Sequence, residues 1–222
     1  MRTVRALFAR EVRLAFAGGG GPAGPAAFFL AALTLAPLAI GPGGPVLAAA
    51  GPGVIAFAAL LAVLQGAERV FGDDLADGTL DVYLVSGLDV SVIAAVKTLA
   101  AGLATLWPLP VIGVLGGVAY GLPVPAALML GAALAVSLPG LSFIAGLAGA
   151  LAAGVKRAGI LVALIAAPLM IPILVFAAAS GRAAFEGDDR ALASAMIAAA
   201  LSLGISALAP FAIGAVLRAR SE

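Results

Sequence analysis

The sequence of 222 residues contains no cysteine and no histidine, and only 10% of its residues are charged. Without cysteine, the chain can form neither disulfides nor thiolate metal sites. Without histidine, it lacks the commonest metal and haem-iron ligand and the usual proton carrier near neutral pH. Among the four methionines, we interpret Met129, Met170 and Met196 as packing residues rather than ligands.

The shortage of charge also argues against a soluble fold, because soluble domains carry about 25% charged residues. Hydrophobic residues make up 64% of the chain, and its mean hydropathy is +1.21. The long apolar runs predict an all-α integral membrane protein. A net charge of +1 gives no electrostatic basis for binding nucleic acid.

We predict a single transmembrane domain over residues 1–222 with six transmembrane helices, because no polar interval is long enough to build a core of its own. An interfacial helix over 1–17 precedes the spans, and a cytosolic segment over 67–90 separates the second span from the third. The six spans are expected at about 23–40, 46–66, 91–120, 124–154, 158–179 and 191–217, with a polar loop from Gly181 to Arg190 before the last.

The N-terminal helix is predicted to be amphipathic and basic, without the apolar run of a cleavable signal. Such a helix suits the surface of an anionic membrane leaflet. Glu11 falls on its apolar side, so its carboxylate needs either an arginine from another cytosolic segment or a route back to water. Gly18–Gly21 and Pro22 are expected to end the helix. The apolar side carries Val4, Leu7, Phe8 and Leu14, and the opposite arc carries Arg2, Arg5, Arg10 and Arg13.

The distribution of basic residues predicts the orientation. If the N-terminus is cytosolic, ten basic residues lie on the cytosolic side and only Arg182 and Arg190 lie outside, as the positive-inside rule requires. The ten are Arg2, Arg5, Arg10, Arg13, Arg69, Lys97, Lys156, Arg157, Arg218 and Arg220.

The interiors of the spans hold no chemistry for catalysis or ion coupling. No acidic residue lies deep in a span, and Lys97 is expected to snorkel to the cytosolic surface, so secondary active transport is disfavoured. The sequence has no Gly-Lys-Ser/Thr phosphate loop, so an ATP site would belong to a partner.

Small residues and caps predict how the helices pack and begin. Gly140, Gly146 and Gly149 permit close helix contacts, although an alanine- and glycine-rich composition alone would also supply them. Asp89 is expected to cap a helix beginning near Val90.

The segment Glu68–Asp81 concentrates five acidic residues in fourteen positions, which can only face water. Helical spacing predicts a carboxylate face of Asp73, Asp74, Asp77 and Asp81, with Val70, Phe71, Leu75 and Leu80 as anchors on the membrane or in a partner's groove. Gly78-Thr79 permits a break, with Thr79 able to cap a new turn. Carboxylates beside apolar anchors suit docking on a partner; the alternative is a solvated loop.

Three stretches of the sequence resemble the CcmB family, the membrane subunit of the haem-exporter-type ABC complex of cytochrome c maturation. They are Leu7–Leu14, Glu68–Asp81 with its Asp-Gly-Thr-Leu core, and Leu88–Lys97. The family's usual glutamate is Asp81 here, and its frequent His-Trp pair is replaced by Ala101-Gly102.

The resemblance implies an ABC exporter permease-like subunit of the bacterial inner membrane, not itself an enzyme. It implies an ATP-hydrolysing CcmA-like partner, CcmC-like and CcmD-like membrane partners, and haem delivered to a CcmE-like periplasmic chaperone. With no histidine, we expect no cofactor bound by this chain. The expected ATPase-coupling residues are Arg10, Glu11, Phe71, Asp73, Asp74, Asp77, Gly78, Thr79 and Asp81. Two alternatives are a permease for drugs, lipids or polysaccharides, and a non-transporting scaffold of the maturation complex.

Overall fold

The computed structural model describes residues 2–17, 21–41 and 43–220, and every regular element in these ranges is a helix. Gly18–Gly20, part of the segment expected to end the N-terminal helix, lie outside the described residues, as does Pro42. Six helical segments of the described chain are long and apolar enough to cross a membrane. The prediction of an all-α integral membrane protein is therefore confirmed.

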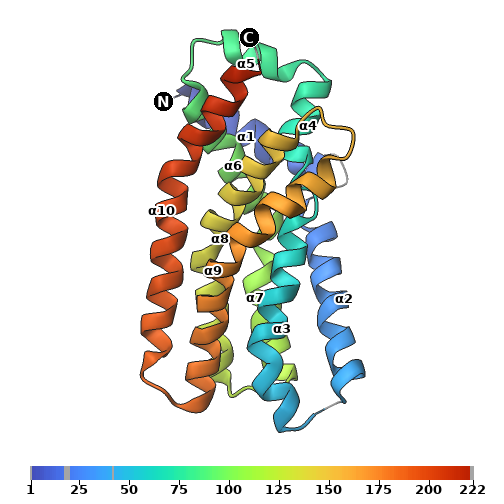
Figure 1. The fold of residues 1–222 in the computed structure, drawn as a ribbon, viewed down its shortest axis with the longest axis vertical. Coiled ribbons are helices and arrows are strands. Elements are labelled where there is room, and N and C mark those ends of the chain that lie inside the picture. The colour runs from blue at the N-terminus through green and yellow to red at the C-terminus, as the bar shows by residue number, and fades with distance from the viewer. Residues whose placement is uncertain (1, 18–20, 42, 221–222) are drawn as a thin grey trace.

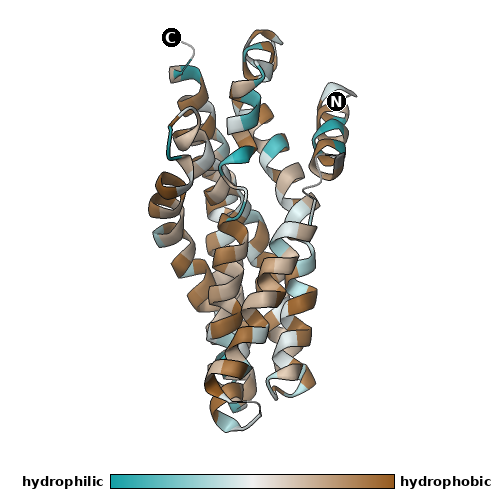
Figure 2. Ribbon diagram, turned by 90° about the vertical axis from the view of Figure 1, so that its right-hand side faces the viewer, coloured by the Kyte–Doolittle hydropathy of each residue, from teal (hydrophilic) through white to brown (hydrophobic). Residues whose placement is uncertain are grey.

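The long helices run side by side, and three short ones gather at one end of them (Figure 1). The long helices are α2 (Ala23–Ile40), α3 (Pro45–Leu64), α6 (Val90–Leu106) followed by α7 (Pro108–Ala119), α8 (Val124–Ala152), α9 (Ala158–Glu186) and α10 (Arg190–Ala219). The short ones are α1 (Arg2–Ala17), α4 (Arg69–Ala76) and α5 (Thr79–Val85). We call the end formed by α1, α4, α5 and the start of α6 the charged end, where hydrophilic residues concentrate (Figure 2).

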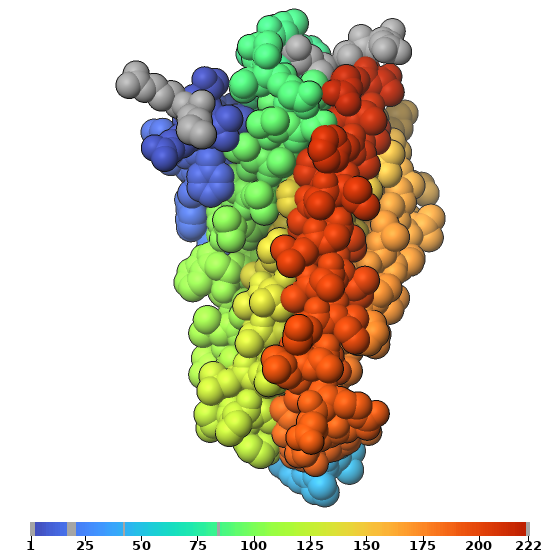
Figure 3. Space-filling view, turned by 90° about the vertical axis from the view of Figure 1, so that its left-hand side faces the viewer, coloured from blue at the N-terminus to red at the C-terminus, as the bar shows by residue number. Residues whose placement is uncertain are grey.

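Helix α8 lies at the centre of the bundle and packs against α7, α9 and α10. Helix α10 runs from one end to the other of the face seen in Figure 3. Glycines allow these close approaches. A Cβ on Gly140 would lie 2.6 Å from the Cα of Ser202, and one on Gly146 would lie 2.8 Å from Thr98. The Gly140 N–H donates to Ser202 Oγ at 2.9 Å. The prediction of close helix contacts at these glycines is confirmed.

The prolines act differently in different helices. Pro108 has no N–H to continue the hydrogen-bond ladder of α6, so the helix stops at Trp107 and α7 begins. Pro139 lies inside α8, and Pro168 and Pro172 lie inside α9, without ending either helix. The third span is thus helical from Val90 to Ala119, with its hydrogen-bond ladder interrupted at Trp107-Pro108.

Helix α9 is longer than expected. It continues to Glu186, seven residues beyond the predicted end at residue 179. The prediction of a polar loop beginning at Gly181 is therefore wrong, and only residues 187–189 separate α9 from α10. Gly181 does not break the helix because it serves packing: a Cβ there would lie 2.8 Å from Leu130.

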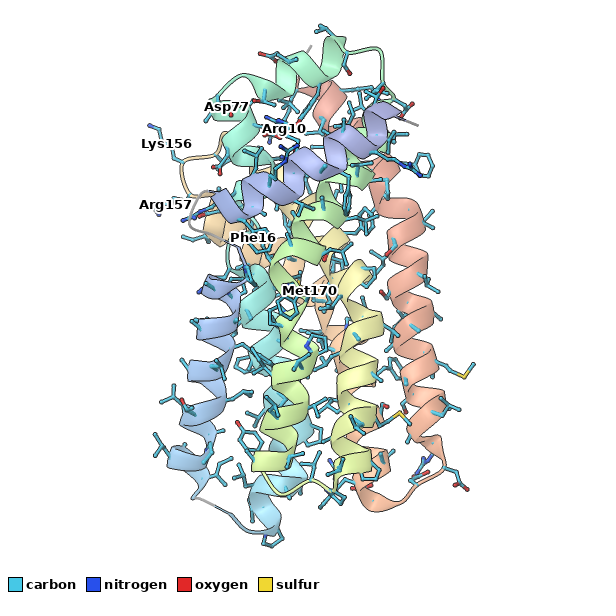
Figure 4. All side chains as sticks on the ribbon, turned by 180° about the vertical axis from the view of Figure 1, so that it is seen from behind. Arg10, Phe16, Asp77, Lys156, Arg157 and Met170 are labelled. Atoms are coloured by element: carbon cyan, nitrogen blue, oxygen red, sulfur yellow. The ribbon has the colours of Figure 1, made fainter. Side chains whose placement is uncertain are left out.

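Helix α1 lies across the bundle at the charged end (Figure 4) and packs against α6. Its predicted apolar side is divided between two environments. Leu7 is buried against the protein, whereas Phe8 and Leu14 remain exposed and can contact lipid. Glu11 lies one turn beyond Leu7 and is also buried.

Candidate functional site at the charged end

Local hydrogen bonds set the directions of the short helices. Asp89 accepts a hydrogen bond from the Ser91 N–H at 2.7 Å, which confirms it as the cap of α6. Gly78 joins α4 to α5 with φ = 78°, in the left-handed region that favours glycine, and so confirms the expected break. Asp77 Oδ1 accepts from the Thr79 N–H at 2.9 Å, so the side chain that supports the start of α5 is Asp77 and not Thr79.

These hydrogen bonds favour the ionised carboxylates. The hydrogen bonds from Thr79 hold the pKa of Asp77 below its usual value, and those from Ser91 do the same for the pKa of Asp89. Both side chains are therefore charged at neutral pH and remain so into mildly acidic conditions.

The turn before α4 and the apolar side of α4 and α5 are fixed against the bundle. A Cβ on Gly149 of α8 would lie 2.3 Å from the carbonyl oxygen of Ala67, so only glycine admits this backbone contact. Phe71 and Leu80 are buried in a cluster that includes Phe143 and Ile213. The expectation that Phe71 and Leu80 anchor on lipid or in a partner's groove is therefore wrong, because the chain's own helices cover them.

A buried ion cluster links α1, α4 and α6. Lys97 Nζ lies 2.7 Å from Glu11 Oε2 and 2.7 Å from Asp74 Oδ2, and the three side chains are only 6–8% exposed. The Glu11 contact is an aligned hydrogen bond, whereas Asp74 Oδ2 is within ion-pair distance without that alignment. Lys97 therefore does not snorkel to water as expected: two carboxylates from other helices hold it in the protein.

Arg10 and Tyr83 extend the cluster to α5. Arg10 Nη1 lies 2.7 Å from Glu11 Oε1, and the same nitrogen donates to the Tyr83 hydroxyl. Tyr83 Oη in turn donates to Glu11 Oε1 at 2.8 Å, and the Arg10 guanidinium lies 5.7 Å from the centre of the Tyr83 ring. Glu11 thus has partners in three elements, including a lysine rather than the expected distant arginine.

Burial and the hydrogen bond to Glu11 raise the pKa of Tyr83 above its ordinary value. Tyr83 therefore stays protonated and acts as a hydrogen-bond donor. The cluster combines two cations and two carboxylates, so its formal charges balance. Its ion pairs and hydrogen bonds hold α1, α4, α5 and α6 together.

The nine residues expected to couple to an ATPase differ in exposure, and Arg10 keeps 42% of its side chain exposed. Asp73, Asp77 and Asp81 are exposed on the side of α4 and α5 away from the bundle, and Gly78 and Thr79 between them are half-buried. Phe71, Asp74 and Glu11 are buried, so the single carboxylate face predicted to include Asp74 is wrong. Figure 4 shows Arg10 on α1 facing the α4–α5 region, and Asp77 at the turn.

This exposed surface also has an apolar part that was not predicted from the sequence. Val82 and Val85 on α5 are 62% and 84% exposed, next to the exposed carboxylate of Asp81. The available signal was the apolar run Val82-Tyr83-Leu84-Val85, which directly follows the acidic segment. We call the surface of Asp73, Asp77, Asp81, Val82 and Val85 the α4–α5 tip.

The position where the resembling family often has a His-Trp pair is filled in a different way. Gly102 is buried, and a Cβ on it would lie 2.1 Å from Ser142 Oγ. A large ring cannot fit at 102 without moving α8. Within the ranges that the structure describes, no three His, Cys, Asp or Glu side chains are arranged to hold a metal ion.

Comparison with known proteins identifies the family to which the chain is similar over almost its whole length. The model of the family described as CcmB protein matches residues 2–220. Heme exporter protein B of Rhodobacter capsulatus is 38% identical over 215 residues, covering 97% of this chain and 98% of the relative.

Two further relatives carry the same name. Heme exporter protein B of Paracoccus denitrificans is 38% identical over 215 residues, covering 97% of this chain and 98% of its own. That of Escherichia coli K12 is 37% identical over 214 residues, covering 96% of each chain. A family match over nearly every residue, together with these identities, shows that the chain belongs to the CcmB protein family.

Proposed function

We propose that this chain is the membrane subunit of a haem-export complex for cytochrome c biogenesis. The observation that carries the proposal is the full-length similarity to relatives named heme exporter protein B, at 34–38% identity. These relatives give no support to a permease for drugs, lipids or polysaccharides. In this role the chain is a non-catalytic subunit, and its haem is cargo rather than cofactor.

The chain is proposed to lie in the bacterial inner membrane with the charged end in the cytosol. The ten basic residues predicted for the cytosolic side, against two on the other, support this orientation. A cytosolic charged end makes the α4–α5 tip available to a CcmA-like ATPase. CcmC-like and CcmD-like proteins in the membrane and a CcmE-like chaperone outside it complete the proposed complex.

The α4–α5 tip has the chemistry of a docking surface for that ATPase. Its exposed valines can enter an apolar groove, and its three carboxylates can select a basic rim. Behind it, Asp74 and Tyr83 connect α4 and α5 to Lys97 of α6 and Glu11 of α1 through the buried cluster. A displacement of the tip by the ATPase is therefore transmitted to α1 and to the third span.

The first experiment is purification of the tagged chain from its native membranes in mild detergent, with partners identified by mass spectrometry. A P-loop ATPase together with haem-handling membrane proteins is the expected result. An ATPase alone would favour a general exporter, and no ATPase would overturn the proposal.

Variants then test the docking surface. Asp77→Lys and Val85→Asp should each lower the recovered ATPase about tenfold, because one reverses a charge and the other puts a charge in an apolar contact. Asp77→Asn, which retains an oxygen for the Thr79 N–H, separates loss of charge from loss of the cap. Asp189→Lys at the opposite end is the matched control and should leave recovery unchanged. Equal recovery with all four variants would contradict docking at the α4–α5 tip.

A further inference from the structure

A groove lies between α3 and α9, in the half of the molecule away from the charged end. One hollow of about 410 Å³ is lined by Ala49, Gly53, Ala178 and Arg182, among others. A second of about 180 Å³ is lined by Phe57, Leu60 and Ile171 and shares Gly53, Val175 and Ala178 with the first. The shared residues make the two hollows one continuous groove.

The groove exists because short side chains face each other across it. Ala49 and Gly53 on α3 stand opposite Ala178 and Ala179 on α9. A Cβ on Gly53 would meet no atom within 4 Å, so no other part of the described chain fills the space. An occupant from outside the chain can therefore enter without displacing protein atoms.

Charge is confined to one end of the groove. Arg182 is the charged residue in its lining, and it lies near the loop that joins α9 to α10. Its Nε donates to Glu186 at 2.9 Å, but both side chains are more than half exposed. Such an exposed pair holds its partners weakly, and a guanidinium has five N–H donors, so Arg182 retains donors for an anion.

The length of the groove matches half of a bilayer. From Ala49 to Leu60 the α3 backbone advances about 16 Å. One leaflet of the hydrocarbon core is about 15 Å thick. The groove therefore runs from a polar surface, at Arg182, to about the middle of the membrane.

We propose that this groove binds a phospholipid with an anionic headgroup, one acyl chain lying between α3 and α9 and the phosphate at Arg182. The apolar lining suits the acyl chain along its whole length. The guanidinium at the outer end favours a headgroup with net negative charge over a zwitterionic one, because the ammonium of the latter competes for the phosphate. The site is independent of the ATPase and of the proposed cargo.

The test is native mass spectrometry of the purified full-length chain in non-ionic detergent with added phosphatidylglycerol or phosphatidylethanolamine of identical acyl chains. Wild-type protein should retain phosphatidylglycerol about fivefold better than phosphatidylethanolamine. Arg182→Gln should abolish this preference while still binding both lipids. Gly53→Leu, which fills the groove from a helical position, should reduce the binding of both.

Arg190→Gln is the matched control, since Arg190 lies at the same end but outside the groove and pairs with Asp188. It should leave the preference intact, and an equal loss in this variant would overturn the proposal in favour of general electrostatic attraction. Unchanged lipid binding in both Arg182→Gln and Gly53→Leu would also overturn it. So would a dimer, or retained haem, that Gly53→Leu removes while phospholipid binding persists, because the groove would then belong to a second copy or to the cargo. Far-ultraviolet circular dichroism checks that each variant is folded.

Discussion

At the charged end, Lys97 lies between Glu11 and Asp74 with all three side chains nearly inaccessible, whereas at the opposite end Arg182 and Glu186 pair with 65% and 51% of their side chains exposed. The N–O distances are similar, 2.7 Å and 2.9 Å. The sequence separations are not: Glu11 and Lys97 are 86 residues apart, and Arg182 and Glu186 are four. Ion pairs between basic side chains and carboxylates join three separate helices at the charged end, whereas at the opposite end the ion pair lies within the single helix α9.

The buried and the exposed ion pair differ in what it costs to break them rather than in the strength of the intact interaction. A buried ion pair returns little net stability when intact, because removing both charges from water is costly, yet breaking it leaves an uncompensated charge in the protein. An exposed pair can be broken at small cost because water replaces the lost partner. The buried cluster therefore fixes how α1, α4 and α6 are arranged, and the exposed pair does not constrain the fold.

The largest effect should come from breaking the buried cluster at its centre. Lys97→Met leaves Glu11 and Asp74 without their shared cation and should lower the free energy of unfolding by about 3–5 kcal/mol. Unfolding in mixed micelles, followed by circular dichroism, measures the change. Arg182→Met is the control at the exposed pair, and a loss below about 1 kcal/mol for Lys97→Met would remove the distinction between the two ends.

An intermediate effect is expected where packing, not charge, holds the charged end. Gly149→Ala would place a methyl group against the Ala67 carbonyl and should destabilise the protein by about 1–3 kcal/mol. Gly204→Ala is its matched control in α10, since a Cβ there meets nothing within 4 Å. That control should be neutral or stabilising by up to about 1 kcal/mol, because alanine favours helix over glycine. The same unfolding assay measures both changes. Equal effects at the two glycines would show that the backbone at Ala67 shifts to make room for the methyl group.

The smallest effect belongs to the exposed pair. Glu186→Gln should change the free energy of unfolding by about 0.2–1 kcal/mol, and less at high salt, because the Arg182 guanidinium is already hydrated. A salt series of the unfolding assay on wild type and variant measures it. A larger loss of unfolding free energy that does not depend on salt would mean that the Arg182–Glu186 pair also stabilises the fold.

The sequence predicted features that depend on residues near one another in the chain. The six long apolar segments, the Asp89 cap and the Gly78 break follow from local composition and hydrogen-bonding preference, and all appear in the structure. The early end assigned to the fifth span failed because Gly181 resembles a break in sequence but is a contact site in three dimensions.

The buried cluster could not be derived in the same way, because its members come from three separated helices. A signal was nevertheless present. Lys97 continues the buried stripe of Ile93, Ala94 and Ala100 on α6, and Glu11 falls on the apolar side of α1. The opposite charges of Lys97 and Glu11, each on a buried helix face, predict an ion pair more strongly together than either charge does alone. The burial of Asp74 depends on how α4 packs against α8 and α6, which no local pattern specifies.

The pairing of Glu11 with Lys97 also sets an order of events during synthesis. Ribosomes add about 5–20 residues per second, so Lys97 emerges about 4 to 17 s after the glutamate that it will bind, 86 residues earlier. Throughout that interval the N-terminal helix must keep its carboxylate in water and wait at the membrane surface. It can take its final place only once the third hydrophobic segment has left the ribosome, so α1 is fixed only after a helix that is made later in the chain.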